Sequence, residues 1–295
     1  MGALTGKTVG LWTSSGLWTA AGDEMTDAAA ELDDLGYKAL WLGSSAGSLR
    51  PHESLLAATT RLVVVSGIIN IWADPPALVA GSYQRVNAAH PGRFLTGLGS
   101  SHAPLVKAEE YRQPLTRLRR YLDDLDALDP TVPAGRRVLA ALGPKTLALA
   151  AERSAGAHPY LTTPEHTAGA RQIMGPSALL APEQKVILET DPATARGIAR
   201  NTLSQYLQLP NYTSSFLRMG FSTDDLEHGG SDRLVDGLIA WGDADAVLKR
   251  VSEHHAAGAD HVCLQVLTSG DRHAGRLPRQ EWRVLAAAIG TRAQA

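Results

Sequence analysis

RLVVVSGIINIW (residues 61–72) and RFLTGLGSSH (residues 93–102) are the two stretches that decide the fold of this chain. Each is almost continuously apolar, and the first is rich in β-branched residues, which is typical of a parallel strand buried on both faces. Between them, Pro75-Pro76 opens a segment with apolar residues at three- and four-residue spacing, and His90-Pro91-Gly92 ends it. This pattern predicts a helix, so the whole stretch predicts a right-handed βαβ unit.

Both of these predicted strands end in small residues, at Ser66-Gly67 and at Gly99-Ser100-Ser101. The carboxyl ends of parallel strands form the active face of α/β folds, and small residues there let a ligand approach backbone N–H groups. Gly143-Pro144-Lys145 repeats the pattern after a later strand. Tight connecting turns would leave the same pattern, but two such turns on one face favour a ligand site.

Length and composition predict one globular domain that spans residues 1–295, because 44% of the residues are hydrophobic and 20% are charged. The net charge of -2 and the scattered Lys and Arg residues argue against nucleic acid or an anionic membrane as the partner. We therefore expect a small-molecule substrate. The single Cys263 lies in an apolar strand pattern, and no signal peptide or long apolar run is visible, which predicts a cytoplasmic protein.

The rest of the chain alternates strand and helix patterns. Further strands are predicted at residues 7–13, 37–42, 137–145, 158–161, 184–189 and 258–267, with helical patterns between them. Eight strands in a chain of this length predict an α/β fold of the (β/α)8 TIM-barrel type, with a doubly wound open sheet as the alternative. Residues 210–234 carry no strand pattern, so we predict a helical excursion after the seventh strand.

Sequence motifs for common chemistries are missing. Gly97-Leu98-Gly99 lacks the third glycine and the acidic residue of a dinucleotide fingerprint, and no HExxH or GxSxG motif occurs, so we predict no metal site. His102 and His158 end predicted strands, where an imidazole could move a proton or bind a phosphate, or could be structural. Trp12 and Trp72 also lie near strand ends and could line an apolar pocket or pack in the core.

With these residues placed, the chain resembles the bacterial luciferase-like monooxygenase superfamily, and within it the branch of F420-dependent oxidoreductases. The resemblance runs through RLVVVSGIINIWADPPAL, HPGRFLTGLGSSHAP, YRQPLTRLRRYLDDLD, ALGPKTLALAAERSAGAHPYLTTPEH, LPNY and GADHVCLQVL. It implies a (β/α)8 barrel that binds coenzyme F420 or FMN at the carboxyl ends of its strands. Hydride would then move through C5 of the deazaflavin.

The resemblance also implies where the cofactor contacts lie. A bulge with a non-prolyl cis peptide follows strand three in such proteins and backs the cofactor ring, and Gly67-Ile68 occupies the matching place. The strand ends and the resemblance together predict these cofactor-binding residues: Ser66, Gly67, Ile68, Asn70, Gly99, Ser100, Ser101, Gly143, Pro144, Lys145, His158, Pro159, Tyr160 and Thr163.

The end of strand two departs from the family pattern. Several deazaflavin dehydrogenases carry an Asp-His pair there, whereas this chain has Ser44 and Ser45, which are poor bases without a partner. We therefore name His102, Ser44 and Ser45 as the candidate catalytic residues. The resemblance implies an F420-dependent oxidoreductase acting on a small organic substrate, with an FMN-dependent monooxygenase and a non-catalytic cofactor-binding barrel as the alternatives, and it implies a homodimer.

The excursion at residues 210–234 carries too many aromatic and aliphatic side chains to stay disordered. We predict that Tyr212, Phe216 and Phe221 help to roof the ligand pocket and exclude water from it. Trp12, Trp72, Tyr212 and Phe216 are therefore the predicted substrate-pocket residues. The alternative is a plain helical hairpin that packs on the side of the barrel.

Overall fold

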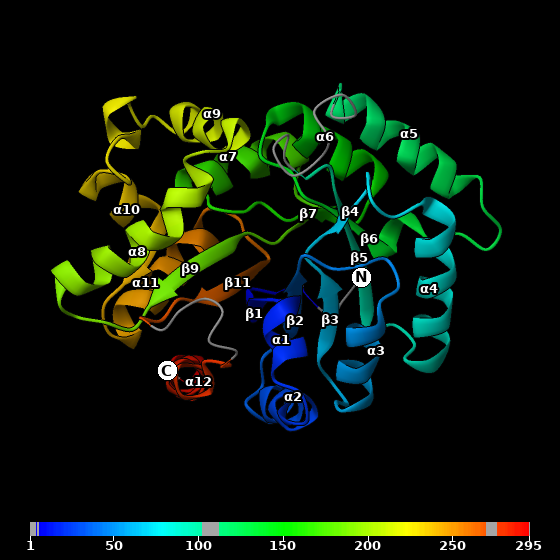
Figure 1. Ribbon diagram of the computed structural model, residues 1–295, viewed down its shortest axis with the longest axis horizontal. Helices are drawn as coiled ribbons and strands as arrows, with labels where there is room; N and C mark the ends of the chain where they lie inside the picture. The colour runs from blue at the N-terminus through cyan, green and yellow to red at the C-terminus, as the bar shows by residue number, and fades with distance from the viewer. Residues whose placement is uncertain (1–3, 5, 102–111, 270–275, 295) are drawn as a thin grey trace.

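The computed structural model describes residue 4 and residues 6–101, 112–269 and 276–294. Its parallel strands form one curled sheet that is surrounded by helices (Figure 1). The strands are β1 Thr8–Ser14, β2 Ala39–Gly43, β3 Val63–Ser66, β4 Ile69–Asn70, β5 Phe94–Gly99, β6 Arg137–Leu139, β7 Gly156–Ala157, β8 Leu179–Leu180, β9 Glu183–Ile187, β10 Ile239–Trp241 and β11 His261–Val266. The predicted α/β barrel is confirmed.

Residues 179–187 join the two ends of this sheet. Within this segment the Glu183 N–H donates to the Pro159 carbonyl oxygen at 2.8 Å, just beyond β7. On its other side the Pro182 carbonyl oxygen accepts from the Cys263 N–H of β11 at 2.9 Å, and β11 pairs with β1. Because β8 and β9 belong to one continuous segment, the strands curl round on themselves and their carboxyl ends meet at one face.

Helices follow the strands in alternation. They are α1 Ser15–Ala20, α2 Glu24–Asp34, α3 Arg50–Ala57, α4 Pro76–Ala89, α5 Pro114–Asp126, α6 Pro144–Arg153, α7 Pro164–Met174, α8 Pro192–Tyr206, α9 Pro210–Arg218, α10 Asp232–Leu238, α11 Ala244–Ala256 and α12 Arg279–Gln294. In α4 to α9 proline occupies the first helical position, where its missing N–H costs nothing. No helix in the described parts of the chain has the length and apolarity needed to cross a membrane.

The stretch that decides the fold behaves as predicted, with one refinement. β3 pairs with β5 in parallel, α4 connects them, and the helix begins at Pro76 and ends at Ala89. The single strand expected over residues 61–72 is divided into β3 and β4, because the chain bulges after Ser66. The peptide bond between Gly67 and Ile68 is cis, so this prediction is confirmed.

Other element boundaries were wrong or missed. β6 ends at Leu139 although the strand pattern runs to residue 145, and β7 begins at Gly156, two residues before its predicted start. The short helix α1 and the strand β10 were not expected at all. β10 follows α10 without a turn residue and pairs with β9, and its three residues lie just beyond the excursion predicted for residues 210–234.

Three apolar clusters hold the fold together. The largest lies between the sheet and the surrounding helices. A second fills the inside of the barrel, with Trp12, Trp41 and the predicted core residue Cys263 among its members. The third is built by α8, α9 and α10 and contains Phe216 and Phe221, so the excursion has its own small core.

Candidate functional site

The predicted cofactor bulge lies against the ends of β1 and β2. The Gly67 N–H donates to the Leu42 carbonyl oxygen at 2.7 Å, and the Ser45 N–H donates to the Ile68 carbonyl oxygen at 3.2 Å. A Cβ atom on Gly67 would lie 3.0 Å from Trp12 Nε1, and one on Gly99 would lie 2.9 Å from the Ile68 side chain. Only glycine keeps these strand ends so close together and leaves their surface clear.

Ser44 and Ser45 have different environments. Ser44 is exposed in a left-handed conformation, whereas Ser45 is buried. The Ser45 hydroxyl donates to the Leu42 carbonyl oxygen at 2.6 Å and lies 3.0 Å from His52 Nε2. Because burial lowers the pKa of His52 to about 3, this imidazole stays neutral, and its Nε2–H donates to Ser45. The Ser45 proton is thus committed to the backbone, which makes Ser45 unsuited to acid–base chemistry.

His158 lies inside the barrel. Its ring stacks on Trp41 with centroids 4.1 Å apart, and its Nδ1 lies 2.7 Å from the Ala181 carbonyl oxygen. Burial lowers the pKa of His158 to about 4, so the imidazole is neutral and Nδ1–H is the donor to this oxygen. Its Nε2 atom is buried without a protein partner in the structure described. His102, the other histidine named from the sequence, lies outside the described residues.

The turn after β5 is braced by aromatic and cationic side chains. Trp72 Nε1 donates to the Ser100 carbonyl oxygen at 2.8 Å, and its backbone N–H donates to Asn70 Oδ1 at 3.1 Å. The guanidinium of Arg117 on α5 lies 5.6 Å from the centre of the Trp72 ring. Arg117 is one of several charged residues in YRQPLTRLRRYLDDLD, and only the packing of α5 brings its charge to this turn.

The turns after β6 and β7 begin helices that point their N-termini at the same face. Gly143 is the N-cap of α6, with Pro144 and the exposed Lys145 in its first turn. Thr163 is the N-cap of α7, and its hydroxyl accepts from the His166 N–H at 3.3 Å. These N-termini favour an anionic group nearby, and the Thr163 hydroxyl caps α7 while its own proton can still be donated.

Sequence reasoning missed a partly buried polar cluster between β9, β11, the turn after β7 and the end of α8, although it named one member, Tyr160. The cluster, which we call the Lys185 network, consists of Tyr160, Glu183, Lys185, Tyr206 and Gln265. Glu183 and Lys185 alternate along β9, so both point into the barrel. The signal in the sequence was two charges two residues apart, with Gln184 between them, at the start of a short strand.

The helical excursion contacts the Lys185 network at Tyr212. The Tyr212 ring lies 6.2 Å from Tyr160 and 5.0 Å from Tyr206, centroid to centroid. Phe216 is fully buried beside Tyr212, and Phe221 packs near Arg233 and Gly237. Tyr212 thus contacts the end of the barrel, as expected for a roof, while Phe216 and Phe221 belong to the core of the helical excursion.

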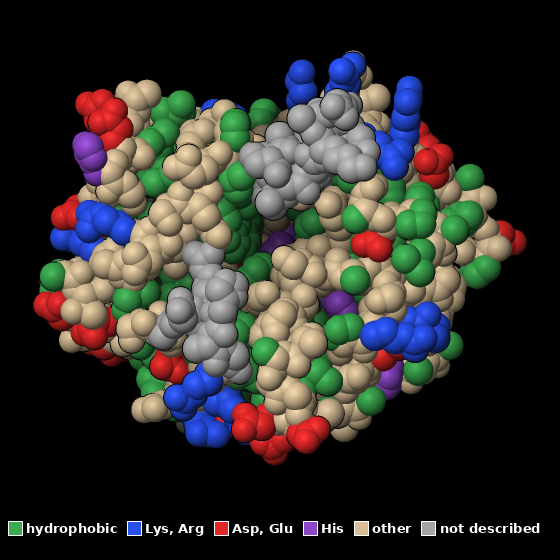
Figure 2. Space-filling view, viewed as in Figure 1, with side chains coloured by type: hydrophobic (Ala, Val, Ile, Leu, Met, Phe, Trp, Pro, Cys, Tyr) green, Lys and Arg blue, Asp and Glu red, His purple; other side chains and the backbone are tan. Residues whose placement is uncertain are grey.

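Polar atoms without protein partners test whether this face fits a flavin-type group. Within the described structure, Trp12 Nε1, His158 Nε2 and Thr162 Oγ1 are buried and lack a hydrogen-bond partner. Buried polar atoms normally have partners, so unsatisfied atoms at strand ends fit a ligand with a polar edge. The molecular face drawn in Figure 2 is hollowed near its centre, with hydrophobic side chains around the hollow. The residues present therefore fit a planar, polar-edged ring.

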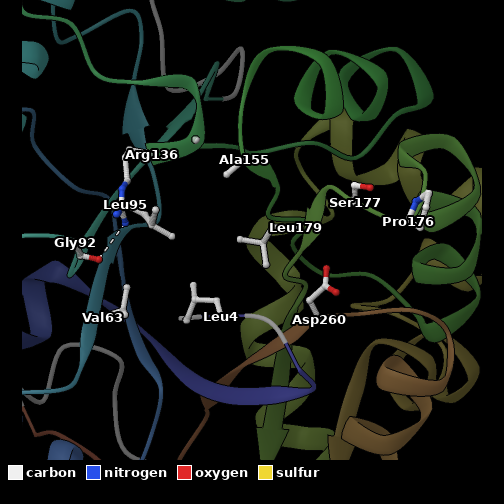
Figure 3. A pocket seen from close by; sticks show the side chains of 11 residues that line it. Leu4, Val63, Gly92, Leu95, Arg136, Ala155, Pro176, Ser177, Leu179 and Asp260 are labelled. Atoms are coloured by element: carbon white, nitrogen blue, oxygen red, sulfur yellow. Dashed lines mark hydrogen bonds between the residues drawn. The ribbon is translucent and has the colours of Figure 1, made fainter. Parts of the chain in front are cut away.

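A cavity at the other end of the barrel is distinct from this site. It has a volume of about 110 Å³ and is walled by Leu4, Val63, Leu95 and Leu179 at the amino ends of the strands (Figure 3). Asp260 at its edge is already paired with Arg171, at 2.7 Å. Packing explains the positions of these residues, because the amino ends of the strands in such barrels contribute to stability and not to catalysis.

The luciferase-like monooxygenase family model matches residues 1–261, and the chain belongs to this family. It is thus an oxidoreductase by class. A Mycobacterium tuberculosis protein is named as a candidate coenzyme F420-dependent oxidoreductase. It is 23% identical to this chain in an alignment of 313 positions, which covers 82% of this chain and 89% of that protein.

Solved structures share the fold. One is an F420-dependent secondary alcohol dehydrogenase in complex with an F420-acetone adduct, with a TM-score of 0.70 and 16% identity over 96% of this chain and 98% of that one. Another is the oxygenating constituent of 3,6-diketocamphane monooxygenase of Pseudomonas putida in complex with FMN, with a TM-score of 0.65 and 13% identity over 95% and 96%. The fold therefore serves both deazaflavin and flavin enzymes.

Proposed function

We propose that this protein is an F420-dependent oxidoreductase that moves a hydride between the deazaflavin and a small organic substrate. The observation that carries the proposal is the set of buried, unpartnered polar atoms at the carboxyl ends of β1 and β7, beside the glycine-lined bulge after β3. The Mycobacterium tuberculosis relative supports the choice of cofactor, because its name assigns it to the F420-dependent oxidoreductases.

The predicted contacts would bind different parts of the cofactor. Gly67 and Ile68 would back the ring, and the turn at Gly99–Ser101, with Arg117 close by through Trp72, would face the anionic part of the cofactor together with the N-terminus of α6. The bound deazaflavin would supply the hydride chemistry at its C5 atom. The protein would supply orientation, exclusion of water and a proton.

The FMN-dependent alternative is favoured by the Pseudomonas putida structure, which binds FMN on the same fold. One titration separates the candidates: the protein is mixed with F420 or with FMN, and fluorescence is followed. We expect F420 to bind at least ten times more tightly than FMN. Tighter binding of FMN would replace the proposal by a flavin monooxygenase, and binding of neither would refute both and leave a role without these cofactors.

We further propose a homodimer in the cytoplasm. Apolar side chains on outer helices, such as Leu78 on α4, Ile173 on α7 and Val284 on α12, are more than 40% exposed in the single chain. These side chains are available to a second copy. Light scattering at micromolar concentration should give twice the mass of 31.3 kDa, and a single-chain mass would refute the dimer.

A further inference from the structure

The Lys185 network contains a complete ion pair inside the barrel. Lys185 Nζ lies 3.0 Å from Glu183 Oε1, and both side chains are 0% exposed. Taking two charges out of water is costly, and apolar side chains of similar volume are often as stable or more stable in such a position. The ion pair is therefore poorly explained by stability alone, and its contact with Tyr160, just beyond the carboxyl end of β7, indicates a role in the site.

The ion pair contacts both Tyr160 and the residue that follows it. Lys185 Nζ lies 3.8 Å from the centre of the Tyr160 ring and donates to Gln265 Oε1 at 2.7 Å. Glu183 Oε2 accepts from the backbone N–H of Leu161 at 3.1 Å, which fixes the chain next to the tyrosine. The ammonium is thus oriented by a carboxylate and an amide oxygen, and it faces the tyrosine ring.

The Tyr160 hydroxyl is part of a chain of hydrogen bonds. It donates to Gln265 Oε1 at 2.8 Å, so the Tyr206 hydroxyl, also at 2.8 Å, must donate to Tyr160. Tyr160 is half-buried, and its ring lies 5.2 Å from that of Trp12, which borders the bulge at Gly67. The Tyr160 ring therefore borders the proposed ring site, and its hydroxyl has the Tyr206 hydroxyl as a second partner.

We propose that Tyr160 is the proton donor to a carbonyl oxygen of the substrate. Lys185 is the residue that positions Tyr160 and stabilises its phenolate form. The inference rests on the proposed function, from which the hydride comes. The substrate carbon would accept the hydride, and the substrate oxygen would take the proton as the Tyr160 O–H bond breaks. The electron pair stays on the phenol oxygen, which recovers a proton from solvent by way of Tyr206. The substrate class is a ketone, an aldehyde or an α,β-unsaturated carbonyl.

The physical chemistry of the network suits this role. Burial raises the pKa of the Tyr160 phenol, so it carries its proton at neutral pH and can give it only to an oxygen that gains negative charge. The ammonium over the ring would stabilise the phenolate that forms. Ser45 and His158 direct their protons to backbone carbonyl oxygens instead. Tyr160 needs only to exchange Gln265 for the substrate oxygen as its acceptor.

The test compares Tyr160→Phe with Tyr37→Phe. Tyr37 also loses a buried hydroxyl that donates at 2.8 Å, but its acceptor is the Trp282 carbonyl oxygen on α12, far along the chain from the network. The probes are reduced F420 and a panel of ketones, aldehydes and enones that begins with acetone and cyclohexenone. In Tyr160→Phe we expect Tm within about 4 °C and F420 affinity within threefold of the wild type, while kcat falls by about 100-fold or more. Tyr37→Phe should keep wild-type kcat.

Each outcome decides one point. If F420 binds and the panel is reduced equally well by the wild type and Tyr160→Phe, the proton-donor assignment is wrong, although the proposed function stands. The same holds if F420 binds and no carbonyl compound in the panel reacts. A loss of F420 affinity as large as the loss of kcat would make Tyr160 a cofactor contact instead. If the wild type does not bind F420, the proposed function itself fails.

A second comparison tests Lys185 as a positioning residue. The double variant Lys185→Met/Glu183→Gln removes both charges, so it should keep the fold while the ammonium is lost from the Tyr160 ring. We expect kcat to fall at least tenfold in the double variant, with a larger solvent deuterium isotope effect than in the wild type because proton transfer becomes slower. A folded double variant with unchanged kcat and isotope effect would show that the ion pair has only a structural role.

Discussion

Four buried histidines should make this protein sensitive to mild acid. Burial lowers the pKa of His52, His254 and His261 to about 3 and that of His158 to about 4. For His254 the main cause is burial, and Arg250, His255 and His166 lower its pKa further. Its Nδ1 lies 2.9 Å from the Thr167 hydroxyl and its Nε2 lies 3.0 Å from Gln184 Oε1, so each ring nitrogen of the neutral form already has a partner.

The sign and size of this change in the free energy of unfolding follow from the difference in proton binding between the folded and unfolded states. In the unfolded chain these histidines have a pKa near 6.5, so the unfolded state binds more protons than the folded state below that pH. The stability they contribute is complete above about pH 6.5 and is lost as pH falls toward their folded pKa. At pH 5 each histidine removes about 2 kcal/mol, and the four together remove about 8 kcal/mol, which approaches the whole stability of a typical domain.

Urea unfolding followed by tryptophan fluorescence between pH 8 and pH 5 measures this effect, above the range in which carboxylates titrate. Near pH 5 the free energy of unfolding should fall with an uptake of about four protons or more, because the pKa values of His90, His166 and His255 are also lowered in the folded state. His254→Gln should lower that uptake by one proton. His228→Gln is the matched control, because the His228 side chain is 96% exposed.

An unfolding free energy that stays constant from pH 8 to pH 5 would refute the reasoning, since it would require these imidazoles to titrate alike in both states. A His254→Gln variant with the wild-type proton uptake would remove His254 from the account. A change in His228→Gln equal to that in His254→Gln would show that burial is not the cause.

Three further changes have expected sizes. Gly97→Ala should destabilise the fold by about 1–3 kcal/mol, because its Cβ would overlap the carbonyl oxygen of Ser66; a melting temperature equal to the wild type would contradict this. Lys185→Met and Glu183→Gln should each cost about 3–5 kcal/mol in urea unfolding, and the double variant less than either; additive costs would contradict the ion pair. Phe216→Ala should cost about 3–5 kcal/mol, because its side chain is fully buried in the excursion core; a loss of ligand affinity without loss of stability would make it a pocket residue instead.

The sequence was sufficient where local pattern and backbone chemistry act over short distances. The buried strands and proline-initiated helices were placed to within a few residues for most of the chain, because apolar periodicity and missing N–H groups are properties of the segment itself. The cis bond after Gly67 was also expected, but through the family resemblance, not from local propensity.

The roles of single polar side chains could not be predicted in the same way. Ser45 and His52 are seven residues apart, and only the packing of α3 on the end of β2 turns the Ser45 hydroxyl into a backbone contact. Arg117 looked like one charge of many on α5, until its position over Trp72 placed it beside the turn after β5.

The sequence by itself determined the class of fold and most of the turns at the carboxyl ends of the strands, the face on which it predicts a ligand. The tertiary structure decided which polar groups share that face. Lys185 and Gln265 come from β9 and β11 and Tyr160 from the turn after β7, up to 105 residues apart, and they meet because residues 179–187 lie between β7 and β11 when the barrel closes. Closure depends on the curl of the whole sheet, and no local pattern in the chain encodes it.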